Sequence, residues 1–141
     1  MSFLLDTNAC IALINEVGRG KPSPVRLRLE RALGSGEQAH VSTVVVFELW
    51  YGVARSAHPE ANAKRVEAFV AGPVSLLPFD NEDAKAAGKI RAAVEAAGKP
   101  IGPYDLLIAG QALRRQLTLV TANVREFGRI KGLLWEDWAK S

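Results

Sequence analysis

Residues 3–8 read FLLDTN, and this stretch decides the fold. The apolar run 3–5 has the length of a short buried strand, and the polar residues after it suit the start of a helix. Thr7 is expected as the N-cap of a helix over 9–16. Asp6 therefore lies where a strand gives way to a helix, which is a position where α/β proteins bind ligands.

The alternation of short apolar runs with longer helical patterns continues to the end of the chain. The loop after the first helix is predicted by Gly18, Gly20, Pro22 and Pro24. Further strands are expected at 39–41, 74–77, 117–120 and 133–135, and further helices at 25–33, 43–56, 59–70, 81–97 and 104–116. This order predicts an α/β fold with a central, mostly parallel sheet covered on both faces, in a single domain over 1–141.

Two of the expected helices begin at capping residues. Ser42 offers an N-cap for the helix over 43–56, and Asn81 offers one for the helix over 81–97. The β-branched run 44–46 leaves an alternative open, in which the second strand continues through these valines. Because the helix over 43–56 is rich in apolar and aromatic side chains, we expect it near a partner or dimer surface.

The composition excludes several classes of protein. The chain is 48% hydrophobic and 23% charged, which is typical of globular proteins and argues against disorder. No apolar run approaches the roughly 20 residues that cross a bilayer, and the features of a signal peptide are missing. Cys10 has no second cysteine to pair with, so a cytoplasmic protein without membrane attachment is expected. The net charge of +3 is compatible with a polyanionic partner.

Three acids lie at or near the starts of expected helices, and each has an ordinary interpretation. Asp6 could cap its helix, and Asp105 could be placed to suit the helix dipole. Glu48 has strongly apolar neighbours, and burial of its charge without a partner would be unfavourable. It could therefore be a solvated glutamate, or one that is paired with Arg55 or another basic residue.

Taken together, Asp6, Glu48 and Asp105 indicate a shared site. Acids at the starts of helices in an α/β sheet could converge at one edge of the sheet, where they would repel one another. A divalent cation removes this conflict and favours the ionised forms. A carboxylate site without cysteine or histidine suits Mg²⁺ or Mn²⁺, which bind phosphate oxygens and activate water.

Four stretches of the chain carry a resemblance: LLDTN (4–8), VSTVVVFEL (41–49), IGPYDLLIAG (101–110) and LVTANVREF (119–127). In this order and spacing they resemble the PIN-domain family, and within it the VapC toxins of bacterial type II toxin–antitoxin pairs. The resemblance covers nearly the whole chain. It implies a three-layer α/β/α fold and an endoribonuclease in which Asp6, Glu48 and Asp105 hold Mg²⁺ or Mn²⁺. It also implies a homodimer and a neutralising VapB-type antitoxin, through which operator DNA is contacted.

The fourth stretch departs from the fuller acidic pattern of that family. Many PIN domains have a fourth acid after the last central strand, where this chain has Asn123, with Glu126 three residues on. Asparagine can bind a metal through its carbonyl oxygen but carries no charge. Glu126 could compensate for the missing charge, or it could be a surface acid of a helix.

Other polar and basic residues adjoin these acids in the sequence. Candidates for orienting the carboxylates or a metal-bound water are Thr7, Asn8, Ser42 and Thr121. Capping and turn formation explain these four equally well. Candidates for contact with the RNA backbone are Arg114, Arg115, Arg125, Arg129 and Lys131. A solvated basic face explains the five almost as well.

Two other functions compete with a ribonuclease. A phosphohydrolase with Asp6 as nucleophile needs a second aspartate two residues on, and this chain has Asn8 there. A non-catalytic interaction or DNA-binding protein would be favoured if Asp6, Glu48 and Asp105 did not converge. Nothing in the sequence reads as a basic helix-turn-helix, which weakens the DNA-binding alternative.

Overall fold

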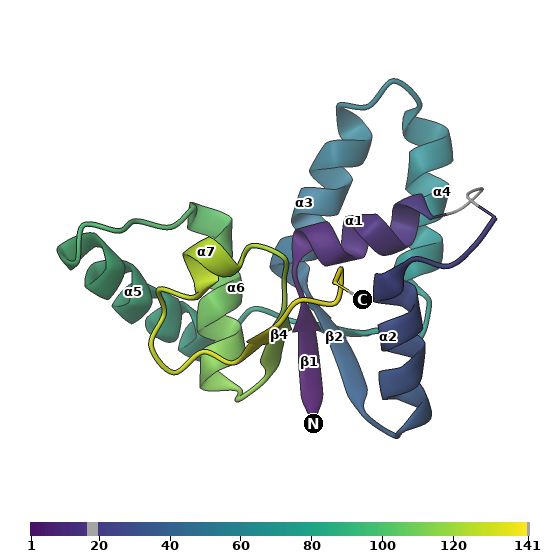
Figure 1. The fold of residues 1–141 in the computed structure, drawn as a ribbon. Helices are drawn as coiled ribbons and strands as arrows, with labels where there is room; N and C mark the ends of the chain where they lie inside the picture. The colour runs from purple at the N-terminus through teal and green to yellow at the C-terminus, as the bar shows by residue number, and fades with distance from the viewer. Residues whose placement is uncertain (17–19, 141) are drawn as a thin grey trace.

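A computed structural model describes residues 1–16 and 20–140 of the chain (Figure 1). Its strands are β1 (Ser2–Leu5), β2 (Gln38–Ser42), β3 (Ser75–Leu77), β4 (Thr118–Val120) and β5 (Trp135–Glu136). Its helices are α1 (Thr7–Asn15), α2 (Pro24–Gly34), α3 (Thr43–Ala54), α4 (Pro59–Val70), α5 (Asn81–Ala96), α6 (Pro103–Arg114) and α7 (Val124–Phe127). No helix in these ranges is long and apolar enough to span a membrane.

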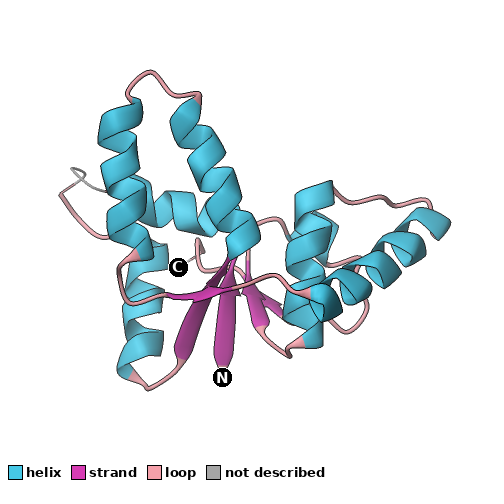
Figure 2. Ribbon diagram, turned by 180° about the vertical axis from the view of Figure 1, so that it is seen from behind, coloured by secondary structure: helices cyan, strands magenta, loops and turns pink. Residues whose placement is uncertain are grey.

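The strands form one sheet in the order β3-β2-β1-β4-β5, and each neighbouring pair runs parallel. Helices flank this sheet on both sides, so the α/β/α arrangement with a central parallel sheet is confirmed (Figure 2). The strand order changes direction at β1, because β2 and β3 follow on one side and β4 and β5 on the other. Such a switch point opens a crevice beyond the carboxyl ends of the strands, where ligands bind in α/β folds.

Several expected boundaries are corrected by the structure. Asp6, rather than Thr7, caps α1, because its Oδ1 accepts a 2.8 Å hydrogen bond from the Ala9 N–H. Asp80, rather than Asn81, caps α5. In both cases an aspartate one residue earlier has the extended backbone that a cap requires. The last strand lies at 135–136 rather than 133–135.

The remaining open points concern the loop after α1 and the valines after β2. Pro24 begins α2 instead of lying in the loop, since proline is well tolerated in the first turn of a helix. Gly18 lies outside the described residues. The valines 44–46 belong to α3, because the Ser42 hydroxyl accepts a hydrogen bond from the Val44 N–H and caps this helix. The alternative of a longer strand is therefore wrong.

The central strand β1 is the centre of the core. Phe3, Leu4 and Leu5 are fully buried, as expected for a strand with neighbours on both sides and helices over both faces. Trp138 fixes the end of the chain over this strand, with its ring in an edge-to-face contact 5.0 Å from that of Phe3. Cys10 is also buried, in keeping with a small apolar side chain in the core.

Helices α3 and α4 form a hairpin that projects beyond the carboxyl ends of the strands (Figure 1). Helix α3 carries Phe47, Trp50 and Tyr51, which are 54%, 36% and 59% exposed. These three side chains are not covered by their own subunit, as a partner or dimer surface on α3 requires.

A cluster of ion pairs between side chains joins helices α5 and α6. Asp83 is buried on α5, where its carboxylate accepts hydrogen bonds from Arg114 and Arg115 at 3.0 and 3.1 Å. Burial acts to raise the pKa of Asp83, but these bonds outweigh it and hold the pKa below its usual value. Arg114 and Arg115 are also ion-paired with Asp80. The sequence suggested that these two arginines contact RNA, whereas in the structure their charges are used to join α5 and α6.

A close contact between backbones also fixes α6 against α5. A Cβ added at Gly110 would lie 2.6 Å from the Ala87 nitrogen and 2.7 Å from its Cα. Both neighbours are backbone atoms, so the helices would have to separate to make room. Glycine is therefore required at this crossing.

We expect Gly110→Ala to lower the free energy of unfolding by about 2 kcal/mol, because the methyl group overpacks the α5–α6 contact. Gly88→Ala is the matched control, since its added Cβ on α5 meets nothing within 4 Å. Better helix propensity should make this control about 0.5–1 kcal/mol more stable. Urea unfolding measures both changes, and equal stabilities of the two variants would contradict the close contact.

Candidate active site

Asp6 lies at the carboxyl end of β1, where the sheet switches direction, and is 4% exposed. Burial is the main cause that raises its pKa above the usual value, and the negative charges of Glu48 and Asp137 raise it further. Hydrogen bonding to the Thr121 side chain and the Ala9 N–H opposes this rise. Asp6 is therefore a helix cap, and the charges of two other acids also act on it, so its role in a metal site stays a prediction beside its capping role.

Glu48 lies on α3 and faces the start of α1. Its Oε1 accepts a 2.7 Å hydrogen bond from the Thr7 hydroxyl. Arg55 lies over the ring of Tyr51 instead, 5.4 Å from its centroid. Pairing of Glu48 with Arg55 is therefore wrong, and Thr7 is the residue that holds this carboxylate at the site.

Asp105 lies in the first turn of α6 and is the acid most strongly affected by its neighbours. Its pKa is raised from 3.8 to about 6, first by burial and then by the charge and hydrogen bonding of Glu126. The charges of Asp6 and Glu48 raise the pKa further. The charges of Asp6, Glu48 and Glu126 therefore all act on Asp105, so the three predicted acids lie at the same edge of the sheet, and their joint binding of a metal stays a prediction.

The Asn123 amide and Glu126 form one unit at the start of α7. Asn123 Nδ2 donates a 2.6 Å hydrogen bond to Glu126 Oε2, and its backbone N–H donates to the Thr121 hydroxyl at 2.9 Å. Glu126 therefore supplies the fourth carboxylate of the cluster, while Asn123 holds it in place. Of the other polar candidates, Ser42 caps α3, because its hydroxyl accepts a hydrogen bond from the Val44 N–H. Asn8 is exposed beside the site.

Asp137 is a residue of the site that the sequence analysis missed. It follows β5 directly, and its charge contributes to the raised pKa of Asp6. The rule that selected Asp6, an acid just after a parallel strand, would also have selected Asp137. The expected strand at 133–135 ended one residue too early to reveal it.

The donor chemistry of the site fits a divalent cation. Its carboxylates are hard oxygen donors, and a cation would relieve the repulsion that raises the pKa of Asp105. Among residues 1–16 and 20–140, no three Asp, Glu, His or Cys side chains lie close enough together to hold a metal ion. The cluster is thus more open than a closed metal site.

Aromatic side chains border the acids on the open side. The ring centroids of Phe47 on α3 and Tyr104 on α6 lie 5.7 Å apart. In the sequence, Phe47 directly precedes Glu48 and Tyr104 directly precedes Asp105. Both are more than 40% exposed, so they form an apolar rim next to Glu48 and Asp105.

A family model described as the PIN domain matches residues 3–133. The chain belongs to the PIN-domain family. Within that family it is 42% identical to a Shigella flexneri protein named tRNA(fMet)-specific endonuclease VapC, over 99% of both chains. This confirms the resemblance to VapC proteins that the four stretches predicted.

Solved structures place this PIN domain in the same group. The VapBC2 complex of Rickettsia felis, bound to a DNA fragment from its promoter, gives a TM-score of 0.88 at 33% identity, over 98% of this chain and 99% of that chain. The DNA-bound VapBC complex of Salmonella typhimurium gives a TM-score of 0.86 at 40% identity, over 98% of both chains. Both were solved as toxin–antitoxin complexes.

The raised pKa of Asp105 predicts how stability of this PIN domain depends on pH. The folded chain binds a proton at Asp105 up to about pH 6, whereas the unfolded chain loses it near the usual value of 3.8. Stability should therefore fall as pH rises from about 4 through 6. At pH 7 without divalent ions, we expect Asp105→Asn to unfold with a free energy about 1 kcal/mol higher than the native chain.

Urea unfolding from pH 4 to 7 in EDTA measures this difference, which should vanish toward pH 4. Glu30→Gln, a change of an exposed acid on α2, is the control and should leave the stability nearly unchanged at every pH. An Asp105→Asn variant that is less stable than the native chain at pH 7 would contradict the repulsion.

Proposed function

We propose that this PIN domain is a metal-dependent endoribonuclease toxin of a toxin–antitoxin pair. The observation that supports it most is that Asp6, Glu48 and Glu126 all act by their charges on Asp105 beyond the carboxyl ends of the strands, where burial and these charges together raise the pKa of Asp105. Such a carboxylate cluster at a switch point suits Mg²⁺ or Mn²⁺. The names of the relatives, which are endonucleases and ribonucleases, agree with RNA as the substrate.

Each acid has a role that follows from its position. Asp6 and Asp105 would hold the ion, because they are short side chains fixed at the ends of β1 and the start of α6. Glu126, positioned by Asn123, would complete the set of oxygen donors. When bound, a divalent cation stabilises negative charge on the phosphate and lowers the pKa of the attacking water.

Glu48 is suited to orient the attacking water. Its Oε1 is engaged by the Thr7 hydroxyl, which leaves Oε2 to accept a hydrogen bond from water. Attack by water on the phosphodiester breaks the bond between phosphorus and the 3′ oxygen. The products are a 5′-phosphate and a 3′-hydroxyl.

The same comparisons support proposals for the partners. The Shigella relative is named for initiator tRNA, so a transfer RNA is the first substrate to test. The solved complexes contain a VapB antitoxin, and we propose an antitoxin of that type here, with operator DNA bound only through it. The exposed aromatic residues of α3 suit a homodimer contact. With these partners, the compartment that we propose is the cytoplasm.

We expect antitoxin-free protein to cleave RNA with Mg²⁺ or Mn²⁺ and to lose the activity in EDTA. Asp6→Asn and Asp105→Asn should each reduce the rate at least about 100-fold, because each removes a charge that would hold the ion. Glu30→Gln keeps the cluster intact and should cleave at the native rate. Gel analysis of transfer RNA with end-group determination measures the rate and the products.

The outcomes separate the enzyme from an interaction protein. Metal-dependent cleavage that both aspartate variants lose supports the nuclease and its site together. Well-folded protein that neither cleaves RNA nor binds Mn²⁺ in calorimetry would refute the site and favour a non-catalytic partner of the antitoxin.

The hydrogen bond from Thr7 to Glu48 makes a separate prediction. Thr7→Val keeps the shape of the side chain but removes the hydroxyl donor, so the cleavage rate should fall about tenfold or more. Thr7→Ser keeps the hydroxyl and should retain most of the rate. Equal rates for the two variants would show that Glu48 needs no anchoring by Thr7.

A further inference from the structure

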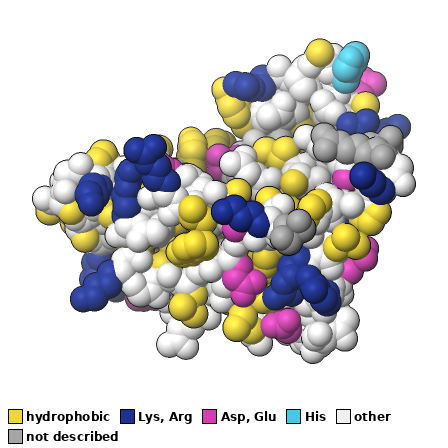
Figure 3. All heavy atoms as spheres, viewed as in Figure 1, with side chains coloured by type: hydrophobic (Ala, Val, Ile, Leu, Met, Phe, Trp, Pro, Cys, Tyr) yellow, Lys and Arg dark blue, Asp and Glu magenta, His cyan; other side chains and the backbone are white. Residues whose placement is uncertain are grey.

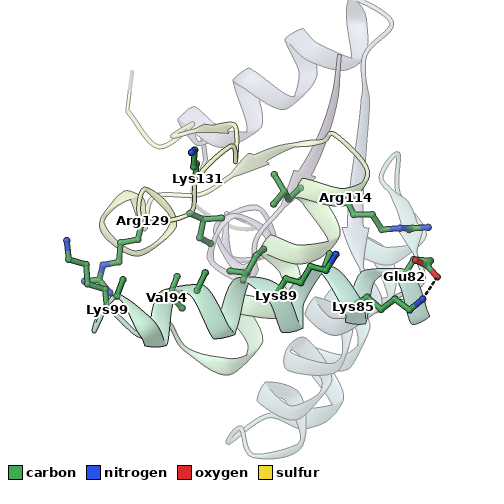
Figure 4. A pocket seen from close by; sticks show the side chains of 14 residues that line it. Glu82, Lys85, Lys89, Val94, Lys99, Arg114, Arg129 and Lys131 are labelled. Atoms are coloured by element: carbon green, nitrogen blue, oxygen red, sulfur yellow. Dashed lines mark hydrogen bonds and ion pairs between the residues drawn. The ribbon is translucent and has the colours of Figure 1, made fainter.

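A groove of about 510 Å³ lies between the outer face of α5, α6 and the segment after α7 (Figure 4). Its floor is apolar and includes Ile90 and Val94 from α5, Leu113 from α6 and Ile130. None of the clustered acids lines it, so the groove is distinct from the candidate active site.

The rim of this groove is strongly basic. Six cations line it, namely Lys85, Lys89, Lys99, Arg114, Arg129 and Lys131, against the single acid Glu82. Figure 3 shows basic side chains on the α5 side of the molecule. Uncompensated charge of one sign in a concave surface attracts a ligand of the opposite sign.

Of the cations that are not neutralised, Lys99, Arg129 and Lys131 lie toward one end of the groove, and Lys89 lies nearer its middle (Figure 4). Glu82 pairs with Lys85, and Arg114 pairs with Asp80 and Asp83. Within the described ranges, Lys89, Lys99 and Lys131 form no ion pair with an acid. Arg129 donates a hydrogen bond to the neutral Pro100 carbonyl at 3.0 Å and so keeps its charge available.

This end of the groove is close to the acids along the chain. Lys99 comes six residues before Asp105, and Arg129 comes three residues after Glu126. The Arg129–Pro100 hydrogen bond joins the two segments. Six residues span at most about 20 Å, so Lys99 and Arg129 lie within the length of a few nucleotides of the cluster.

We propose that this groove binds the sugar-phosphate backbone of the RNA strand on one side of the cleavage site. The proposal rests on the function proposed above. The clustered carboxylates repel a polyanion, and Lys99 and Arg129, within about 20 Å of them, offset that repulsion. A second copy of the chain is a poor occupant, because it would bring the same positive rim against this one. An acidic protein segment would also match the charge, but it gives no reason for Lys99 and Arg129 to lie at the end next to the acids.

The test measures RNA binding separately from cleavage. Fluorescence anisotropy in EDTA follows a labelled single-stranded RNA of about 12 nucleotides, a length that exceeds the site sizes of many single-strand binders. The groove variant combines Lys89→Gln, Lys99→Gln and Lys131→Gln. The control variant combines Lys21→Gln, Lys64→Gln and Arg65→Gln, which removes three exposed charges elsewhere.

We expect the groove variant to bind at least about tenfold more weakly at low salt, and the slope of log Kd against log salt to decrease by about 2, because each phosphate contact to a single strand contributes about 0.7. The control variant should keep the native slope. If the groove variant keeps the native affinity and slope, or if both variants change equally, the RNA assignment is overturned and an acidic protein segment becomes the better occupant.

The result is independent of catalysis. RNA binding through the groove by a protein that does not cleave would support the groove and refute the nuclease. Cleavage with unchanged binding by the groove variant would support the nuclease and refute the groove.

Discussion

Mutual repulsion among carboxylates at one edge of the sheet is the constraint on which the rest of the structure depends. Acids that are free in solution separate, whereas here Asp6, Glu48, Asp105 and Glu126 are held together by four different elements. Burial first, and then the charges of Glu126, Asp6 and Glu48, raise the pKa of Asp105, so the fold holds this carboxyl group where its ionised form is disfavoured. A site of this kind favours the binding of a cation, because the positive ion relieves the repulsion between the carboxylates.

The fold meets this constraint through its helix starts. Asp6 caps α1 and Asp105 lies in the first turn of α6, where unpaired backbone N–H groups favour negative charge. Both helices begin near the carboxyl ends of the strands, because α1 follows β1 directly and α6 leads the chain back to the start of the parallel strand β4. Hydrogen bonds from Thr7 and Asn123 then hold the longer glutamates in place. Short acids are thus fixed by the backbone and long acids by neighbouring side chains.

The sequence predicted the parts of this arrangement that depend on local patterns. Alternating apolar runs predicted the order of strands and helices, and the ends of strands pointed to Asp6. Glu48 could not be placed from the sequence alone, since its partner Thr7 is 41 residues away and only the tertiary fold brings them together. Asp137 was missed for the related reason that β5 is two residues long, too short for a hydrophobic pattern to fix its end. The basic residues of α6 were misassigned because their partners Asp80 and Asp83 lie on another helix.

The layer formed by α5 and α6 links the acidic site to the basic groove. Helix α6 carries Asp105 on its first turn, and its position against α5 is fixed by the Gly110–Ala87 contact and by buried Asp83. Helix α5 also carries Lys85 and Lys89 of the groove. Because Asp105 and Lys89 are carried by two helices that pack directly on each other, the distance between these two residues is set by helix packing. A strand of RNA that occupied the groove would therefore present a defined phosphate to the acids, so the choice of cleavage position would depend partly on residues far from the reacting bond.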